Sequence, residues 1–572
     1  MNSQIKLSFI LILLFTILSY SLTAQAGRTP VPAKNGMVVS SHYLGSQVGK
    51  DILAKGGNAV DAAVGTAFAL AVTLPSAGNI GGGGFLVYHG ADGEQTTFNF
   101  REKAPKAATK TMFLDENGKI KNNSNHSGPL SVGVPGTVAG LWAAHQKMGK
   151  LPWGDLVQPA IDLAEKGFPS TWAMQGFLKR MKKAKEPIYD GTKKAFLKKG
   201  NELYTPGELW KQPDLAATLK RIQKDGRDGF YKGTTAKLIA DFMKKHNGLI
   251  TEADLAAYQP TEQKPIHGTY KGYDVYGMPP PSSGGVAIVE MLNILEGFNL
   301  KELGHNSALY LHILTEVMRT AFADRAEHIG DPLFNPEMPV EELISKAYAD
   351  ELRPTIDWFK ATESDSSKFN RVRFMEESEE TTHFSVVDKD GNAVSLTYTL
   401  EHSYGSRITV EGAGFLLNNE MGDFNPIPGV TTSRGMIGTK PNLVAPEKRM
   451  LSSMSPTIVA KDGKPILIIG SPGGRTIINT TLQVILNVID HEMTVAEAIE
   501  APRIHHQWLP DITSFEKLGI SPDTKRMYEM MGHKIRYRGT QGRAMGIYLD
   551  QKEGIIYGAA DSRSFDGRAV GW

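Results

Sequence analysis

The chain has 572 residues, of which 63 are basic and 61 acidic, and this small formal charge of +2 gives no basis for binding nucleic acid or another highly charged partner. It contains no cysteine, which excludes disulfides, thiol nucleophiles and cysteine-ligated metals. A hydrophobic content of 41% is ample for one large core, and without internal repeats or long linkers we expect one interleaved body rather than the several domains that the length suggests.

The first 26 residues have the pattern of a secretory signal peptide. Lys6 is followed by a mostly apolar stretch from 7 to 22, and Ala24-Gln25-Ala26 offers small residues at a cleavage site. An uncleaved membrane anchor is the alternative, but residues 19–21 interrupt an apolar core that is barely long enough to span a bilayer. We therefore expect an exported protein, periplasmic or secreted, with no membrane span after signal removal.

The chain between the signal and residue 380 is predicted to be rich in helices. Gly56-Gly57 ends a helix over 44–55, and Asn58 can cap the Ala-rich helix that follows over 58–72. Further helices are expected over 138–147, 153–166, 215–224, 287–296 and 306–328, with short strands over 85–89 and 97–101.

The periodicity changes to that of strands after an acidic run at 376–380. Strands over 383–388 and 393–399 flank Lys389-Asp390-Gly391, a hairpin loop whose last residue needs the left-handed conformation that glycine adopts easily. Continuing this register places Thr399 opposite Thr381, whereas a slip of one residue would put the two on opposite faces. A second hairpin over 457–469 leads into a Ser-Pro-Gly-Gly turn. Helices outside paired antiparallel sheets, an α+β fold, are the simplest packing.

Thr381 begins this strand-rich part. If the chain were cut between Glu380 and Thr381, the threonine would carry both a hydroxyl nucleophile and its own α-amine as a base. Model α-amines titrate at about 7.7–8.0, so an appreciable fraction is unprotonated near neutrality. In the uncut chain the hydroxyl could attack the carbonyl of Glu380, and water would hydrolyse the resulting ester. Threonine is also common in strands, so the pair Thr381-Thr382 does not decide the matter alone.

The surrounding residues resemble a known family. The segment 381–424, TTHFSVVDKDGNAVSLTYTLEHSYGSRITVEGAGFLLNNEMGDF, is similar to the processing region of γ-glutamyltranspeptidases, which are N-terminal nucleophile hydrolases. The similarity continues at 56–63, 78–84, 134–137 and 278–285, and so spans nearly the whole chain after the signal. It implies a four-layer αββα sandwich, built from a large subunit 27–380 and a small subunit 381–572 that self-cleavage produces and that remain together as a heterodimer.

The resemblance also implies a role for each residue that matches the family pattern. It makes Thr381 the nucleophile, Thr399 its hydrogen-bonding partner, and the backbone of Gly473 and Gly474 the oxyanion hole. The remaining matches would bind the two charged groups of a γ-glutamyl substrate. Its α-carboxylate would be bound by Arg101, Ser452 and Ser453, and its α-ammonium by Glu401, Glu420 and Asp423. Taken alone, Arg101 is more typical of a surface ion pair than of a substrate-binding residue, Ser452-Ser453 is typical of a loop, and Thr399 of a cross-strand threonine pair.

Some positions differ from better-known members of that family. Glu401 and Glu420 stand where many relatives have Asn and Gln, and the added negative charge is expected to strengthen ammonium binding. The segment 425–442 resembles the active-site lid, with Arg434 near the place of a lid tyrosine found in some bacterial members.

Other chemistries find little support in the sequence. The glycines at 81–84 lack the GK[ST] ending of a phosphate loop, no GxSxG motif occurs, and His505-His506 stands without HExxH, so we predict no cofactor and no catalytic metal. The resemblance implies cleavage of glutathione and related γ-glutamyl compounds through a γ-glutamyl-threonine intermediate, with transfer to water, amino acids or peptides. Alternatives are a cephalosporin or glutaryl acylase, a poly-γ-glutamate processing enzyme, and a non-catalytic exported glutathione-binding protein.

Overall fold

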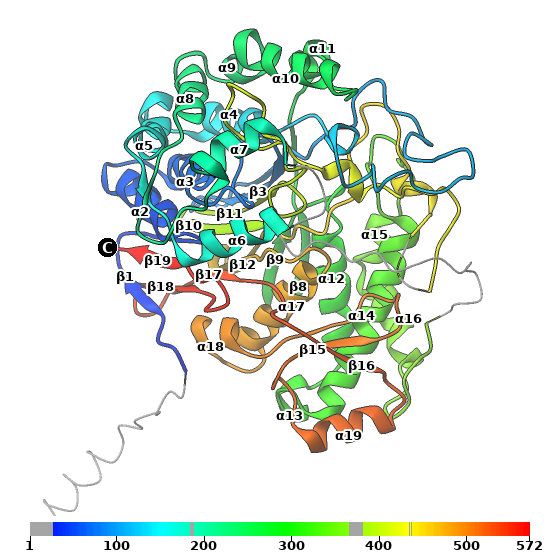
Figure 1. Ribbon diagram of the computed structural model, residues 1–572. Helices are drawn as coiled ribbons and strands as arrows, with labels where there is room; N and C mark the ends of the chain where they lie inside the picture. Colours follow the sequence, from blue (N-terminus) through cyan, green and yellow to red (C-terminus); the bar gives the residue numbers. More distant parts are fainter. Residues whose placement is uncertain (1–26, 184–187, 365–380, 434, 436) are drawn as a thin grey trace, which may run out of the picture.

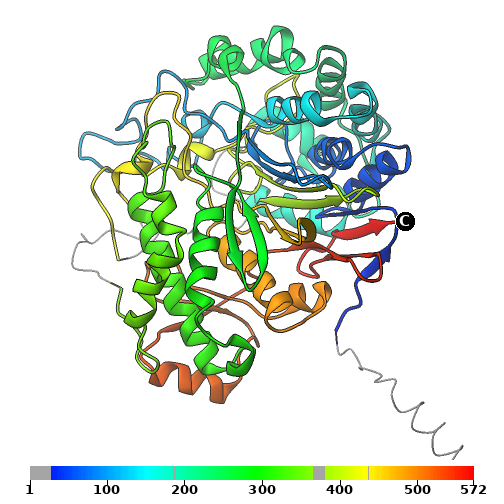
Figure 2. The ribbon, with the colours of Figure 1, turned by 180° about the vertical axis from the view of Figure 1, so that it is seen from behind.

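The computed structural model describes residues 27–183, 188–364, 381–433, 435 and 437–572. The predicted signal peptide, Glu380 and Arg434 lie outside the described residues. In the described part, two seven-stranded sheets lie face to face with helices on the outer side of each (Figures 1 and 2). The predicted αββα sandwich is therefore confirmed. Among the same residues, no helix is long and apolar enough to cross a membrane.

The sheet that carries Thr381 is antiparallel throughout. Its strands are, in order, β19 (Arg568–Gly571), β2 (Met37–Ser40), β10 (Thr382–Val387), β11 (Ala393–Thr399), β3 (Gly83–His89), β4 (Gln95–Asn99) and β7 (Thr261–Gln263). Thr382 lies opposite Tyr398, which is the predicted register, and Gly391 has the expected positive φ of 92°. The predicted strand over 97–101 ends early, because the Asn99 side chain accepts the N–H of Arg101 (3.0 Å) and turns the chain out of the sheet.

The second sheet is also antiparallel and contains the predicted hairpin over 457–469. Its strands are β1 (Val31–Ala33), β18 (Ile555–Ala560), β17 (Met545–Asp550), β13 (Lys464–Ile469), β12 (Thr457–Lys461), β9 (Tyr273–Gly277) and β8 (Ile266–Tyr270). Two small sheets consist of β14 (Ile504–His505), β15 (Thr513–Glu516) and β16 (Ile535–Arg538), and of β5 (Phe168–Pro169) and β6 (Leu209–Trp210).

Helices cover the Thr381-bearing sheet at the top of Figure 1. They are α2 (Tyr43–Ala54), α3 (Ala59–Thr73), α4 (Thr137–Met148), α5 (Trp153–Lys166), α6 (Trp172–Lys183), α7 (Asp190–Phe196), α8 (Pro213–Asp225), α9 (Asp228–Tyr231), α10 (Gly233–Lys245) and α11 (Glu252–Ala257). Asn58 caps α3 as predicted, and a capping box with Asp61 holds the start of this wholly buried helix.

The other sheet is covered by the helices of the lower half of Figure 1. These are α12 (Gly284–Leu295), α13 (Leu300–Leu303), α14 (Ala308–His328), α15 (Val340–Leu343), α16 (Lys346–Leu352), α17 (Thr476–Ile489), α18 (Val495–Glu500) and α19 (Pro522–Met530). The short 3₁₀ turns are Pro129–Ser131, Lys199–Asn201, Arg353–Thr355, Glu420–Asp423 and Lys440–Asn442.

The apolar core has three layers, one between the sheets and one under each helical layer. Alternation along the strands produces this division, since neighbouring side chains point to opposite faces. Val38 of β2 packs toward α2 and α3, for example, while Val39 packs toward Ile458 and Ile468 of the second sheet. The two sheets are thereby held face to face, with the start of β10 beside the loop that follows β13.

Candidate active site

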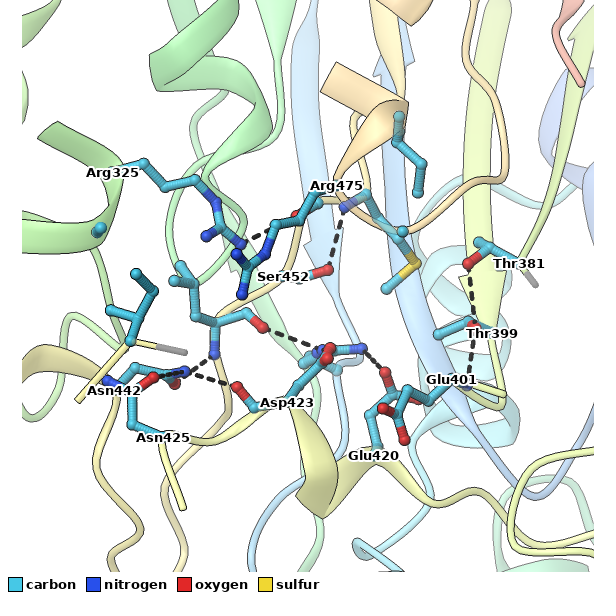
Figure 3. A pocket seen from close by; sticks show the side chains of 18 of the residues that line it. Arg325, Thr381, Thr399, Glu401, Glu420, Asp423, Asn425, Asn442, Ser452 and Arg475 are labelled. Carbon is cyan, nitrogen blue, oxygen red and sulfur yellow. Dashed lines mark hydrogen bonds and ion pairs between the residues drawn. The ribbon is translucent and has the colours of Figure 1, made fainter. Parts of the chain in front are cut away.

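All of the predicted catalytic and substrate-binding residues except Gly473 line one cavity, which Figure 3 shows from close by. Thr381 and Thr399 lie at the right of the view with Glu401 beside Thr399, and Glu420, Asp423 and Arg325 lie farther to the left. The cavity therefore combines two threonine hydroxyls with groups that can bind both signs of charge.

Thr381 immediately precedes β10 and is 6% exposed. Its hydroxyl donates to the hydroxyl oxygen of Thr399 (3.3 Å), and that oxygen also accepts the backbone N–H of Glu401 (2.9 Å). The antiparallel register brings the two threonines together, because they continue the pairing of Thr382 with Tyr398. Thr399 thus has the position of a group that orients the Thr381 hydroxyl.

The Gly473-Gly474 turn joins β13 to α17. Gly473 has φ of 138° and Gly474 of 57°, both in the region that favours glycine. A Cβ at Gly473 would clash with the hydroxyl of Thr476, so the turn also depends on the missing side chain. The N–H groups of Thr476 and Ile477, the first two residues of α17, donate to the carbonyls of Gly473 and Gly474 (3.1 Å each), which fixes the turn against the helix. Gly474 lines the cavity two residues before α17 begins, close to the N-terminus of that helix.

Arg101 is fully buried and bound to acceptors on several segments. Its guanidinium donates to the carboxylates of Glu420 and Asp423 and to the carbonyls of Met450 (3.4 Å) and Leu451 (3.2 Å). Burial lowers the pKa of Arg101, but the surrounding carboxylates outweigh burial and raise it overall. Arg101 is therefore a permanent cation rather than the surface residue that its type alone suggests.

A third carboxylate belongs to this cluster and was not predicted from the sequence. Glu102 is fully buried, 3.7 Å from the Arg101 guanidinium. Burial raises the pKa of Glu102 to about 7 and that of Glu420 well above its usual range, in spite of the nearby cation. Arg101 is thus surrounded by three carboxylates, and Arg325 and Arg475 line the same cavity, so groups of both charges are available to a ligand.

Glu401 lies against two histidines that the sequence did not single out. Its Oε1 is 2.8 Å from Nδ1 of His126 and 3.5 Å from Nε2 of His402. The backbone φ of Glu401 is 73°, uncommon for a residue with a side chain. Burial lowers the pKa of His402 to about 3, so its ring is neutral.

The paired serines are fixed by a second arginine that was also missed. Arg325, on α14, donates to the hydroxyls of Ser453 (2.9 Å) and Ser283 (2.8 Å). The Ser452 hydroxyl accepts the N–H of Met454 (3.2 Å), and its carbonyl accepts the hydroxyl of Ser283 (2.7 Å). Arg325 stands on a predicted helix, but only the packing of that helix places it at the cavity.

The segment 425–442 borders the same cavity, as expected for a lid. Asn425 donates to the carbonyl of Thr439 (2.7 Å), and both residues line the cavity together with Asn442. The described part of the segment contains turns and one 3₁₀ turn, Lys440–Asn442, and no strand.

The sandwich and its threonine-containing cavity define an N-terminal nucleophile hydrolase. The family model described as gamma-glutamyltranspeptidase matches residues 45–572. The chain is 48% identical over 543 residues to the glutathione hydrolase proenzyme of Escherichia coli K12, covering 95% of this chain and 93% of that protein. It is 44% identical over 570 residues to the glutathione hydrolase proenzyme of Pseudomonas sp. A14, covering 98% of each.

A solved structure has the same architecture over nearly its whole length. The cephalosporin acylase from Bacillus halodurans aligns with a TM-score of 0.83 and 29% identity, covering 97% of this chain and 98% of that one. The family match and the identities of the curated relatives settle the classification: this chain belongs to the γ-glutamyltranspeptidase family.

Proposed function

We propose that this chain is a self-processing γ-glutamyltransferase and glutathione hydrolase that acts through an acyl ester on Thr381. One observation carries the proposal: the hydroxyl of Thr381, the guanidinium of Arg101 and the carboxylates of Glu401, Glu420 and Asp423 all line a single cavity. A γ-glutamyl group needs both the hydroxyl and the charged groups, because its reactive carbonyl lies at one end and a zwitterion at the other. The two curated relatives named above are glutathione hydrolase proenzymes.

Maturation would cut the chain between Glu380 and Thr381. The Thr381 hydroxyl attacks the carbonyl of Glu380, its proton leaves through Thr399 or water, and the acyl group moves from nitrogen to oxygen. Water then hydrolyses the ester, which releases the carboxylate of Glu380 and the α-amine of Thr381. The products are a large subunit 27–380 and a small subunit of 572 − 380 = 192 residues.

In turnover the new α-amine is the general base. It takes the proton of the Thr381 hydroxyl while the oxygen attacks the γ-amide carbonyl, and the oxyanion forms against the backbone N–H groups of Gly473 and Gly474. The proton passes to the departing amine, leaving a γ-glutamyl ester on Thr381. Water, or the amine of an amino acid or peptide, then attacks the ester and restores the free hydroxyl.

The substrate would be recognised by an exchange of ion-pair partners around Arg101. The α-carboxylate of the substrate would bind the guanidinium and the hydroxyls of Ser452 and Ser453. Its α-ammonium would meanwhile compensate Glu420 and Asp423, which the guanidinium now contacts. Because a zwitterion carries no net charge, its entry leaves the charge of the buried cluster unchanged.

A glutaryl acylase is the nearest alternative, since a cephalosporin acylase has the same fold. A glutaryl group carries the carboxylate without the ammonium, and would take up the Arg101 guanidinium without supplying a positive group to Glu420 and Asp423. The acidic cluster therefore favours the γ-glutamyl group. Comparing kcat/KM for γ-glutamyl and glutaryl anilides tests this preference, and an equal or better glutaryl substrate would contradict it.

The processing step is tested on purified protein by mass measurement and N-terminal sequencing. We expect a smaller chain that begins Thr-Thr-His-Phe-Ser, and a Thr381→Ala variant that stays in one piece and is inactive. Thr382→Ala is the matched control, since it removes the same atoms from the neighbouring residue. A Thr381→Ala variant that is cut and active would refute the assignment, and a cut-free, inactive wild type that binds glutathione would favour the non-catalytic binding protein.

We further propose that the protein is exported, on the evidence of the signal-like residues 1–26. Cell fractionation should place the activity in the periplasm or the medium, with the large subunit beginning near Gly27. Activity confined to the cytoplasm, with Met1 still present, would contradict export.

A further inference from the structure

Two histidines and a carboxylate gather at the edge of the cavity. His126, Glu401 and His402 each offer one ligand atom, and the three atoms lie within 4.8 Å of one another. The Glu401 oxygen is 2.8 Å from His126 Nδ1 and 3.5 Å from His402 Nε2. Donor atoms about 3.4 Å apart are what tetrahedral coordination at roughly 2.1 Å requires, so side-chain movements would suffice for Zn²⁺.

The backbone holds this group in place. The Asn419 side chain accepts the N–H of His402 (3.0 Å) and donates to the carbonyl of His126 (3.1 Å), tying the two segments together. The two imidazoles stack with their centroids 4.9 Å apart and their planes 7° from parallel. A Cβ at Gly422 would clash with the His126 ring, so that ring is seated against bare backbone. The positions of the two histidines are therefore fixed by the backbone, and because the lone pair of each nitrogen lies in its ring plane, one ring must rotate out of the stack for both to bind one ion.

An ion can reach the cluster from the cavity, and one of the histidine nitrogens has no hydrogen bond within the described part of the chain. Nε2 of His402 is buried and has no hydrogen-bond partner among the described residues. Glu401 lines the cavity, and the side chains of His126 and His402 are 13% and 31% exposed. An ion entering through the cavity could bind three protein ligands and keep a fourth position for water, a coordination common for Zn²⁺.

A second group of this composition, formed by His312, Glu316 and His533, does not have these properties. Its members are buried, His312 Nδ1 is 2.7 Å from His533 Nε2, and His312 Nε2 is 2.7 Å from the carbonyl of Asp357. Both nitrogens of His312 are thus engaged in hydrogen bonds. This second group is structural.

We propose that His126, Glu401 and His402 form a binding site for a divalent transition-metal ion such as Zn²⁺, and that the bound ion inhibits the enzyme. The ion would hold the Glu401 carboxylate and place positive charge where the α-ammonium of the donor binds. Zn²⁺ and donor would then compete. The inhibition rests on the proposed function, whereas metal binding itself does not depend on it.

The test uses tag-free mature protein treated with a chelator. Titration calorimetry with ZnCl₂, without substrate, should show one site per chain, and hydrolysis of a γ-glutamyl anilide should show a KM that rises with Zn²⁺ at constant kcat. His126→Gln and His402→Gln should each weaken Zn²⁺ binding by more than the roughly 10- to 100-fold typical of losing a supporting partner. Each variant is compared with its own metal-free rate and melting temperature.

His267→Gln is the matched control, because His267 forms an exposed pair with Asp274 on β9 (2.8 Å) and should leave Zn²⁺ binding unchanged. The site would be overturned if the wild type bound no Zn²⁺, or if His126→Gln and His402→Gln both bound Zn²⁺ as tightly as the wild type does. Zn²⁺ binding that requires both histidines but leaves KM unchanged would uphold the site and overturn its competition with the donor ammonium.

Discussion

Removing the Arg101 cation should affect stability and substrate binding separately. Arg101→Met keeps much of the side-chain length but leaves Glu420 buried without its cation, so that at pH 8 its carboxyl must either stay charged and unpaired or take up a proton, and either costs free energy of folding. Breaking one partner of a buried ion pair costs about 3–5 kcal/mol of unfolding free energy. Adding Glu420→Gln removes the stranded charge, so the double variant should recover most of that loss. Neither variant can bind the donor carboxylate, and losing a charged hydrogen bond worth about 1.5–3 kcal/mol should lower kcat/KM roughly 10- to 150-fold.

Stability is measured by denaturant unfolding at pH 8 in a Thr381→Ala background, so that every sample is expected to be one uncut chain. Activity is measured in the processing-competent background with a γ-glutamyl anilide. Lys166→Met is the control, because Lys166 forms an exposed pair with Asp162 (3.0 Å) and such surface pairs contribute about 0–1 kcal/mol. If Glu420→Gln fails to restore the stability lost with Arg101, a stranded buried charge is not the cause and the reasoning is wrong.

Three further changes test other parts of the site. Thr399→Val removes the hydroxyl that lies 3.3 Å from the hydroxyl of Thr381. Because a neutral hydrogen bond contributes about 1 kcal/mol, self-cleavage and turnover should both slow several-fold. If the rate of chain cleavage followed on gels is unchanged, Thr399 has only a structural role. Burial raises the pKa of Glu102 from 4.5 to about 7, so the folded state holds the proton more tightly than the unfolded state does. The free energy of unfolding should therefore fall by about 3 kcal/mol as the pH rises across that interval. The Glu102→Gln variant should lack this loss of stability when its unfolding midpoints at pH 5 and pH 8 are compared. Gly473→Ala introduces strain at φ 138° and a clash with Thr476, and should lower kcat about 10²- to 10³-fold with little change in KM, whereas normal turnover would exclude this turn from the oxyanion hole.

Local rules were sufficient to predict the hairpin that follows Thr381. The loop ending in Gly391 fixed the register, and that register alone predicted the meeting of Thr381 and Thr399. The predicted strand over 97–101 was wrong at its end, because the side chain of Asn99 captures the backbone of Arg101. Strand propensity cannot foresee such a side-chain contact, and here it is what turns Arg101 into the cavity.

Residues brought to the cavity by tertiary packing left little signal in the sequence. Arg325 lies on a helix that was predicted, but its direction depends on how α14 packs against α12. Glu102 follows Arg101 directly and resembles any polar residue of a loop. His126 precedes Glu401 by 275 positions, and the Asn419 side chain joins their segments. The family pattern supplied the residues expected to touch the substrate, but not those that fix their orientation and charge.

The interleaving of the chain explains how a cut at Thr381 can leave the site intact. The hairpin β10–β11 lies between β2 and β3, both from the part of the chain before the proposed cut. β10 pairs with β2 over Phe384–Val387, and β11 pairs with β3 along its whole length. The ion pairs of Arg101 with Glu420 and Asp423 join the same two parts. Cleavage would therefore free the α-amine of Thr381 while two hydrogen-bonded strand pairings and a buried charge cluster keep the two subunits and the cavity together.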